Sequence, residues 1–192
     1  YEGVLGMEQG ARCKPENSNW LPFIRNAVGP MDFTPGSMFS AQPEDNRSTG
    51  ANPMGTGTRA YQMALYVVSE SPLQMPADNP VLYRREHLCT EFLAAVPTTW
   101  DSLRVCGREV VVARRKGDKW YVGGITNDRS YTTEIALDFL PAGRTFTKTS
   151  FEDGVNADLQ ATDYRKRVRE VDASTVVKVE MVRNGGWAAV IE

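Results

Sequence analysis

The stretch from Arg108 to Asn127, "REVVVARRKGDKWYVGGITN", decides how the second half of this chain folds. It consists of two apolar runs that are joined by the four residues Lys-Gly-Asp-Lys. Two such runs around a short turn that contains glycine are typical of a β-hairpin. We therefore expect antiparallel strands in this part of the chain.

The same strand pattern continues to the last residue. Apolar or β-branched side chains alternate with period two in two further segments: Ile135, Leu137 and Phe139, and Thr175, Val177, Val179 and Met181. The final residues, "NGGWAAVIE", have the pattern of a turn and a last strand. Several short strands without helices between them favour an antiparallel β-sandwich or half-barrel.

The first half has the patterns of helices and loops. Five apolar residues recur at the spacing of one helix face: Ala60, Met63, Ala64, Val67 and Val68. Thr58 is a suitable N-cap for this helix, and Pro72 should end it. Residues 79–96 predict a second helix. The polar loop 36–57 is long enough that we expect it to be functional or disordered.

A domain boundary is therefore expected at Pro97, which separates residues 1–96 from residues 97–192. The segment "FIRNAVGPMDFTPG" predicts a helix, then a short buried strand that ends near Asp32. Residues 1–96 are therefore expected to combine helices and loops with a short strand near Asp32. The fold class expected for the whole chain is α+β.

Composition excludes several classes of function. The net charge is −2, so nothing indicates a nucleic-acid partner. The basic run "YRKRVREVD" carries acidic residues at its end and is interpreted as a solvated strand or turn. The three cysteines lie far apart and form no CxxC pair, so a zinc knuckle is not expected. The chain contains no run of 18 apolar residues, so a membrane-spanning helix is not expected.

Two carboxylates stand six residues apart in the opening stretch "YEGVLGMEQG", namely Glu2 and Glu8. Gly3 and Gly6 would let the chain turn sharply there. Paired carboxyl groups can hydrolyse a glycosidic bond, and carboxylate oxygens also suit calcium. Spacing alone favours neither chemistry over two solvated side chains. Asp32, at the end of its strand, could face an active site or cap the turn that follows.

Six stretches together resemble the C-terminal part of glycoside hydrolase family 97, in the order that the family has them. They are "EGVLGMEQG", "GPMDFTPG", "GTRAYQMALYVVSESPLQMPADNP", "CTEFLAAVPTTWD", "VVVARRKGDKWYVGGITN" and "NGGWAAVIE". The family contains calcium-dependent α-glucosidases and α-galactosidases, mostly from Bacteroidota. The resemblance implies that residues 1–96 are the last strand-helix units of a (β/α)8 barrel. Residues 97–192 would be the C-terminal antiparallel β-sandwich domain.

The resemblance also assigns roles to the two glutamates. Glu2 matches a calcium ligand, and Glu8 matches the general acid that protonates the glycosidic oxygen. The second catalytic carboxylate and the other calcium ligands would lie upstream, in a missing N-terminal part of the same polypeptide. The missing carboxylate is a base in inverting members and a nucleophile in retaining ones. The expected substrate is an α-linked oligosaccharide, the expected location is the periplasm, and the fragment alone is expected to be inactive.

Two other classes of function remain open for the β half. It could be a carbohydrate-binding module, in which case Trp120 and Trp187 should be exposed and coplanar on one face. It could also be a purely structural domain that caps the barrel and binds no ligand of its own.

Overall fold

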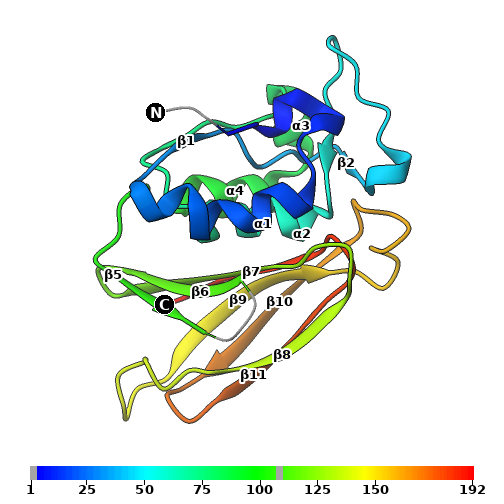
Figure 1. Ribbon diagram of the computed structural model, residues 1–192. Coiled ribbons are helices and arrows are strands. Elements are labelled where there is room, and N and C mark those ends of the chain that lie inside the picture. Colours follow the sequence, from blue (N-terminus) through cyan, green and yellow to red (C-terminus); the bar gives the residue numbers. More distant parts are fainter. Residues whose placement is uncertain (1–3, 107–109) are drawn as a thin grey trace.

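The computed structural model describes residues 4–106 and 110–192, and these residues form three layers (Figure 1). A helical layer lies on one face of a six-stranded sheet, and a two-stranded sheet covers the opposite face (Figure 1). The helices come from the first half of the chain and both sheets that form the sandwich come from the second half.

The helical layer contains four α-helices, three 3-10 helices and four very short strands within the described residues. In chain order these are η1 (Met7–Arg12), α1 (Pro15–Ile24), η2 (Asn26–Val28), β1 (Asp32–Phe33), β2 (Ser40–Ala41), η3 (Pro43–Asp45), β3 (Gly55–Thr56), α2 (Arg59–Val68), β4 (Leu73–Gln74), α3 (Pro80–Arg85) and α4 (His87–Ala95). β1 pairs with β4 in parallel, and α2 lies between them in the chain. The order strand, helix, parallel strand defines a βαβ unit.

Helix α2 begins where its sequence predicts. The Thr58 side chain accepts a hydrogen bond from the Tyr61 amide, and every residue of the helix is buried. The predicted end at Pro72 is wrong, because Ser69 already has extended backbone angles (φ −80°, ψ 135°). The predicted helix 79–96 is divided into two helices, because Glu86 has non-helical backbone angles (φ −97°, ψ 46°) and separates α3 from α4.

The six-stranded sheet has the order β10-β9-β12-β7-β6-β5, and all its neighbours are antiparallel. Its strands are β5 (Ser102–Val105), β6 (Val110–Lys116), β7 (Lys119–Ile125), β9 (Phe146–Asp153), β10 (Tyr164–Val171) and β12 (Gly186–Ile191). The predicted hairpin is confirmed, because β6 and β7 pair up to Lys116 and Lys119 around the turn at Gly117.

The second layer of the sandwich is the antiparallel pair β8 (Tyr131–Ala136) and β11 (Val176–Met181). The alternation predicted around Val177 is confirmed, since Val177, Val179 and Met181 are buried and Val176 and Lys178 are exposed. These side chains meet buried residues of β6, β7 and β12 in one hydrophobic core. The strand predicted to reach Phe139 is shorter, because β8 ends at Ala136.

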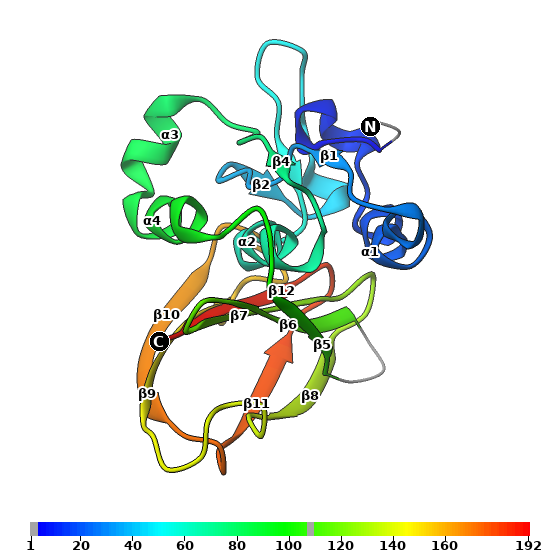
Figure 2. The same cartoon turned by 90° about the vertical axis from the view of Figure 1, so that its left-hand side faces the viewer.

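Glycines let α2 lie directly on the six-stranded sheet (Figure 2). A Cβ atom at Gly123 of β7 would lie 2.8 Å from Cβ of Val67, and one at Gly186 of β12 would lie 2.6 Å from the Tyr61 nitrogen. Real Cβ atoms do not approach other heavy atoms so closely. A second hydrophobic core fills this interface and joins the helical layer to the sheet.

The polar loop 36–57, expected to be functional or disordered, carries β2, η3 and β3. Its centre is held by Asn46, whose amide group donates to Met54 O at 3.0 Å, to Gly55 O at 3.2 Å and to Thr56 Oγ1 at 3.1 Å. These bonds fix the segment between η3 and β3.

Candidate functional site

Glu8 lies at the carboxyl end of strand β1. It is an exposed residue of η1, and its carboxylate lies over Gly6. A Cβ atom added at Gly6 would lie 2.7 Å from Cβ of Thr34, the residue that directly follows β1. Because Gly6 has no side chain, the Glu8 carboxylate and Thr34 share this space. The carboxyl ends of parallel strands are where barrel enzymes place their reactive groups.

The segment that carries Glu8 is anchored on both sides. The Met7 amide donates to Thr34 O at 2.8 Å, and the Met7 side chain is buried. The amide group of Gln62 contacts Met7 Sδ at 3.2 Å. On the other side, the Cys13 thiol donates to Leu5 O at 3.1 Å. Glu8 is therefore an exposed carboxylate on a segment whose neighbours are fixed.

The Cys13 thiol beside this segment has no catalytic character. Burial raises its pKa to about 11, with a smaller opposing contribution from its hydrogen bond to Ser18. A thiolate is the form that attacks substrates and binds metals, so Cys13 acts here as a small buried side chain.

Helix α2 fixes the chain that follows β1. Gln62 Oε1 accepts hydrogen bonds from the Gly36 and Ser37 amides, both at 3.1 Å. Arg59 donates to Met38 O at 3.0 Å and forms an ion pair with Glu86 at 2.9 Å. Two side chains of one helix therefore hold the loop next to the Glu8 segment.

Asp78 completes the anchoring of this loop. Its carboxylate accepts hydrogen bonds from the Phe39 amide at 2.9 Å, from the Met38 amide and from Ser37 Oγ at 3.2 Å. Burial raises the pKa of Asp78, and these hydrogen bonds oppose the rise. Because its acceptor positions are used by the loop, Asp78 has a structural role.

The other residues singled out in the sequence are not brought to Glu8. Asp32 is half-buried on β1, and no hydrogen bond or ion pair within the described part of the chain joins it to Glu8. His87 is the first residue of α4. Glu2 lies outside the described residues, so its predicted role stays a prediction.

The tryptophans do not form an exposed pair on the β half. Trp187 is 2% exposed and belongs to the sandwich core. Trp120 is half-buried against Phe139, with ring centroids 4.5 Å apart and planes inclined by 44°. The coplanar exposed surface that a carbohydrate-binding module needs is absent at these two residues. Trp20 of α1 is 60% exposed.

Asp153, at the end of β9, is a buried carboxyl group that sequence reasoning missed. It accepts hydrogen bonds from Thr58 Oγ1 at 2.6 Å, from the Val182 amide at 3.0 Å and from the Gly186 amide at 3.2 Å. Thr58 caps α2, so one carboxyl group joins the helical layer to two places in the β half. Burial outweighs these bonds and raises the pKa of Asp153 to about 6.

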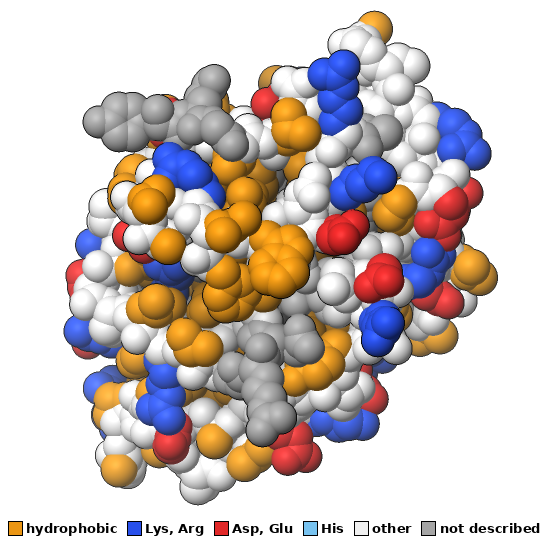
Figure 3. Space-filling model, viewed as in Figure 1, with side chains coloured by type: hydrophobic (Ala, Val, Ile, Leu, Met, Phe, Trp, Pro, Cys, Tyr) orange, Lys and Arg blue, Asp and Glu red, His pale blue; other side chains and the backbone are white. Residues whose placement is uncertain are grey.

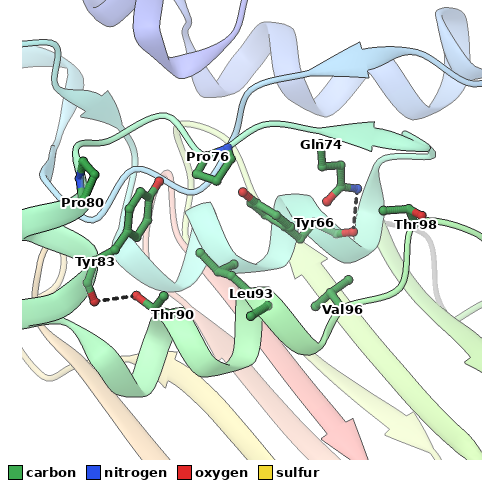
Figure 4. Close-up of a pocket in the computed structure, with 10 residues that line it drawn as sticks. Tyr66, Gln74, Pro76, Pro80, Tyr83, Thr90, Leu93, Val96 and Thr98 are labelled. Carbon is green, nitrogen blue, oxygen red and sulfur yellow. Dashed lines mark hydrogen bonds between the residues drawn. The ribbon is translucent and has the colours of Figure 1, made fainter.

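A cavity of about 470 Å³ lies between α2, α3 and α4 (Figure 4). Tyr66, Tyr83, Leu93 and Val96 point into it, and neither Glu8 nor any other carboxylate lines it. A glycosidic bond could not be protonated there. The cavity is therefore separate from the candidate catalytic group.

Neither a metal-binding cluster nor a membrane-spanning helix occurs within the described ranges. In residues 4–106 and 110–192, no three His, Cys, Asp or Glu side chains are grouped so that they could hold a metal ion. None of the helices in the same ranges has the length and hydropathy of a membrane-spanning helix.

Comparison with known proteins identifies the family. Residues 99–192 match the family model described as "Glycosyl-hydrolase 97 C-terminal, oligomerisation". The chain is 40% identical, over its whole length, to a retaining alpha-galactosidase of Bacteroides thetaiotaomicron, of which it covers 30%. It is 31% identical over 98% of its length to a probable retaining alpha-galactosidase of Streptomyces bingchenggensis, of which it covers 27%.

A similar solved structure also comes from glycoside hydrolase family 97. A family 97 glycoside hydrolase from a Pseudoalteromonas strain, in complex with acarbose, superposes with a TM-score of 0.82. That comparison has 34% identity and covers 93% of this chain and 28% of the other. The fold and the matches thus define a chain similar to the C-terminal part of family 97 glycoside hydrolases. Residues 99–192 belong to the C-terminal domain of glycoside hydrolase family 97, and the chain spans less than a third of the length of these relatives.

Proposed function

We propose that this chain is part of a longer enzyme that hydrolyses terminal α-galactosidic bonds with retention of configuration. The observation that carries the proposal is the 40% identity, along the entire chain, to a retaining alpha-galactosidase. A second relative with the same kind of activity in its name supports it. The second candidate is an α-glucosidase, because the similar solved structure was obtained with acarbose.

In this proposal Glu8 is the general acid. Glycoside hydrolysis needs a carboxyl group that protonates the leaving oxygen and a second carboxylate, which is the nucleophile in a retaining enzyme. Glu8 is exposed at the carboxyl end of β1, where a substrate could reach it, and its anchored neighbours Met7 and Cys13 fix the backbone. The nucleophile would come from residues outside this chain.

We further propose that residues 1–96 are the last strand-helix units of a (β/α)8 barrel. The parallel pair β1 and β4 around α2 supports this. Hydrophobic side chains also gather on the surface over α1 (Figure 3), where Trp20, Phe23 and Ile24 are more than half exposed. An apolar patch of this kind normally marks an interaction site. Preceding barrel units would cover it.

Residues 97–192 have, in our proposal, a structural role. They present a six-stranded sheet whose outer face shares a hydrophobic core with α2 and α4, and Asp153 adds hydrogen bonds at the same junction. The buried Trp187 gives no support to a carbohydrate-binding module. The role of capping the helices agrees better with these contacts.

Calcium binding and export to the periplasm are also part of the proposal. The ion would take one carboxylate from Glu2 and its other ligands from outside this chain. No group of three or more His, Cys, Asp or Glu side chains that could hold a metal ion occurs among the described residues. When bound, calcium would gather carboxylates at the site. Metal analysis of the purified full-length protein and its distribution between cell fractions test the two points.

Hydrolysis of nitrophenyl glycosides tests the proposed activity. The full-length protein should have a higher kcat/KM for the α-galactoside than for the α-glucoside, and the product released first should be the α-anomer. Residues 1–192 alone should hydrolyse neither, because they lack the nucleophile. A preference for the glucoside would favour the second candidate, and turnover by the isolated chain would contradict the division of the site between this chain and the rest of the protein.

A further inference from the structure

On β9 and β10, at one end of the sandwich, charged side chains lie on the face of the sheet that is directed toward the inside of the sandwich. The register of these strands pairs Lys148 with Arg169, Ser150 with Arg167, and Glu152 with Arg165. On the other side of β9, Trp187 pairs with Glu152 and Ile191 pairs with Lys148, and both β12 residues belong to the inner core. Directly paired residues lie on the same face of a sheet. The charged side chains therefore face the space between the two sheets.

This end of the sandwich forms a cleft of about 360 Å³ between β9–β10 and β11. Five cationic and three acidic side chains line it: Lys148, Arg165, Arg167, Arg169 and Lys178, and Glu152, Glu170 and Glu180. The cleft carries two excess positive charges, whereas the whole chain has a net charge of −2. Positive charge is thus concentrated at one place in an otherwise acidic protein.

The carboxylates of the cleft leave part of this positive charge unpaired. Glu152 pairs with Arg167 at 3.2 Å, and Glu180 pairs with Lys178 at 2.7 Å. Over the described residues, Lys148, Arg165 and Arg169 have no ion-pair partner within 4 Å. The buried Nε of Arg165 also lacks a hydrogen-bond acceptor.

Lys148 is the most unusual of these groups, because the residue is only 5% exposed. Its ammonium group lies 3.3 Å from Ser150 Oγ and 5.3 Å from the centroid of the Trp187 ring. Burial lowers the pKa of this ammonium group. The Glu152 carboxylate opposes this shift, but it is already paired with Arg167. A buried cation whose nearest anion is shared with another cation is costly. A bound anion would remove that cost.

Protection of a sheet edge explains only part of the pattern. β10 is an edge strand, and charges that point inward discourage pairing with another chain. That role suits Arg167 and Arg169. It does not account for Lys148, which lies on β9 inside the sheet and is buried.

We propose that the cleft between β10 and β11 binds a small oxyanion, a carboxylate or sulfate group that is either free or carried by an acidic sugar. Lys148 supplies a buried positive charge at its floor, and Arg165 and Arg169 supply guanidinium groups that can bind an oxyanion with two parallel hydrogen bonds. This site is independent of Glu8 and of the proposed hydrolysis.

Titration calorimetry of the full-length protein tests the site, with sodium sulfate and sodium galacturonate as probes at a constant ionic strength. At least one of them should bind. Arg169→Gln and Lys148→Met should each weaken binding by about tenfold or more, which is the effect of removing a hydrogen bond to a charged group. The matched control is Lys166→Gln, on the same strand but on the opposite face against Phe151, and it should bind like the wild type.

The two probes distinguish the source of the anion. Tighter binding of sulfate indicates a free inorganic anion, and tighter binding of galacturonate indicates an acidic sugar. Galactose serves as the neutral control for binding at the catalytic site. The proposal is overturned if neither anion binds, or if Lys166→Gln weakens binding as much as Arg169→Gln. It is also overturned if both inner-face variants, shown to be folded by thermal unfolding, retain full affinity.

Discussion

At the scale of single residues, Asp153 connects the two halves of the molecule. Its carboxyl group reaches the cap of α2 through Thr58 and the last two strands of the sandwich through the amides of Val182 and Gly186. Nothing in the sequence around "FEDG" distinguishes it from a solvated turn residue. Its burial depends on β12 and α2, which lie far from it in the chain.

The raised pKa of Asp153 predicts how stability changes with pH. The pKa is about 6 in the folded protein and 3.8 ordinarily. Between these values the unfolded chain has lost a proton that the folded protein retains. The contribution of Asp153 to the free energy of unfolding is therefore complete below the lower value and is lost as pH rises to about 6. The expected size is about 3 kcal/mol.

Urea unfolding of the wild type and of Asp153→Asn, compared between pH 4 and pH 7, measures this contribution. The amide does not titrate, so the stability of the wild type relative to the variant should fall as pH rises. Asp172→Asn is the control, because hydrogen bonds from Ser174 lower the pKa of the exposed Asp172 below 3.8. Its contribution to stability is lost only below that value, so the control should change little between pH 4 and pH 7. A stability difference between the wild type and Asp153→Asn that does not depend on pH would refute the assignment.

At the scale of elements, the close approach of α2 to the sheet depends on glycine. A methyl group at Gly186 would lie 2.6 Å from the Tyr61 nitrogen and 2.9 Å from the carbonyl carbon of Ala60. Backbone atoms of a buried helix cannot move aside as a flexible side chain can. The helix would have to separate from β12.

Gly186→Ala should therefore lower the free energy of unfolding by about 1–3 kcal/mol, the usual cost of overpacking, or by more. Gly50→Ala is the control, because a Cβ atom there meets no atom within 4 Å, and it should leave stability nearly unchanged. Denaturant unfolding of both variants gives the comparison. Equal stability of Gly186→Ala and the wild type would mean that α2 does not lie on β12 as described.

The periodicity of apolar residues predicted most helices and strands, but it did not predict which charged side chains of β10 face the inside of the sandwich. The β6–β7 hairpin and the buried face of β11 follow from alternation, and α2 follows from its apolar face and its Thr58 cap. In "YRKRVREVD", charged residues occupy both faces of β10, so alternation cannot say which face is inside. The interpretation as a solvated strand or turn is confirmed, because β10 is a strand with mostly exposed side chains, but it does not identify the cleft.

At the scale of the whole molecule, the sequence carries the family but only part of the site. The resemblance to family 97 is confirmed by a family model over residues 99–192 and by a relative that matches the entire chain. Glu8, the proposed general acid, is among the described residues, and Glu2 lies outside them. The remaining groups of a glycosidase site cannot be predicted from this chain, because barrel sites draw residues from many strands.

The central claim is that Glu8 protonates the leaving oxygen, and leaving-group dependence tests it most directly. Full-length Glu8→Gln should be compared with the wild type on methyl α-galactoside and on dinitrophenyl α-galactoside. A methoxide leaving group needs protonation, whereas dinitrophenolate leaves without it. The variant should lose about 10²- to 10⁴-fold in kcat/KM on the methyl glycoside and much less in kcat/KM on the dinitrophenyl glycoside. The comparison uses kcat/KM because it reports the step in which the leaving group departs, whereas the same residue also acts as base in the second step of a retaining enzyme.

Glu16→Gln changes an exposed carboxylate in the first turn of α1 and should leave both activities unchanged. The account predicts a large ratio between the two losses for Glu8→Gln and a ratio near one for Glu16→Gln. Equal losses on both substrates, or full activity of Glu8→Gln on the methyl glycoside, would contradict it.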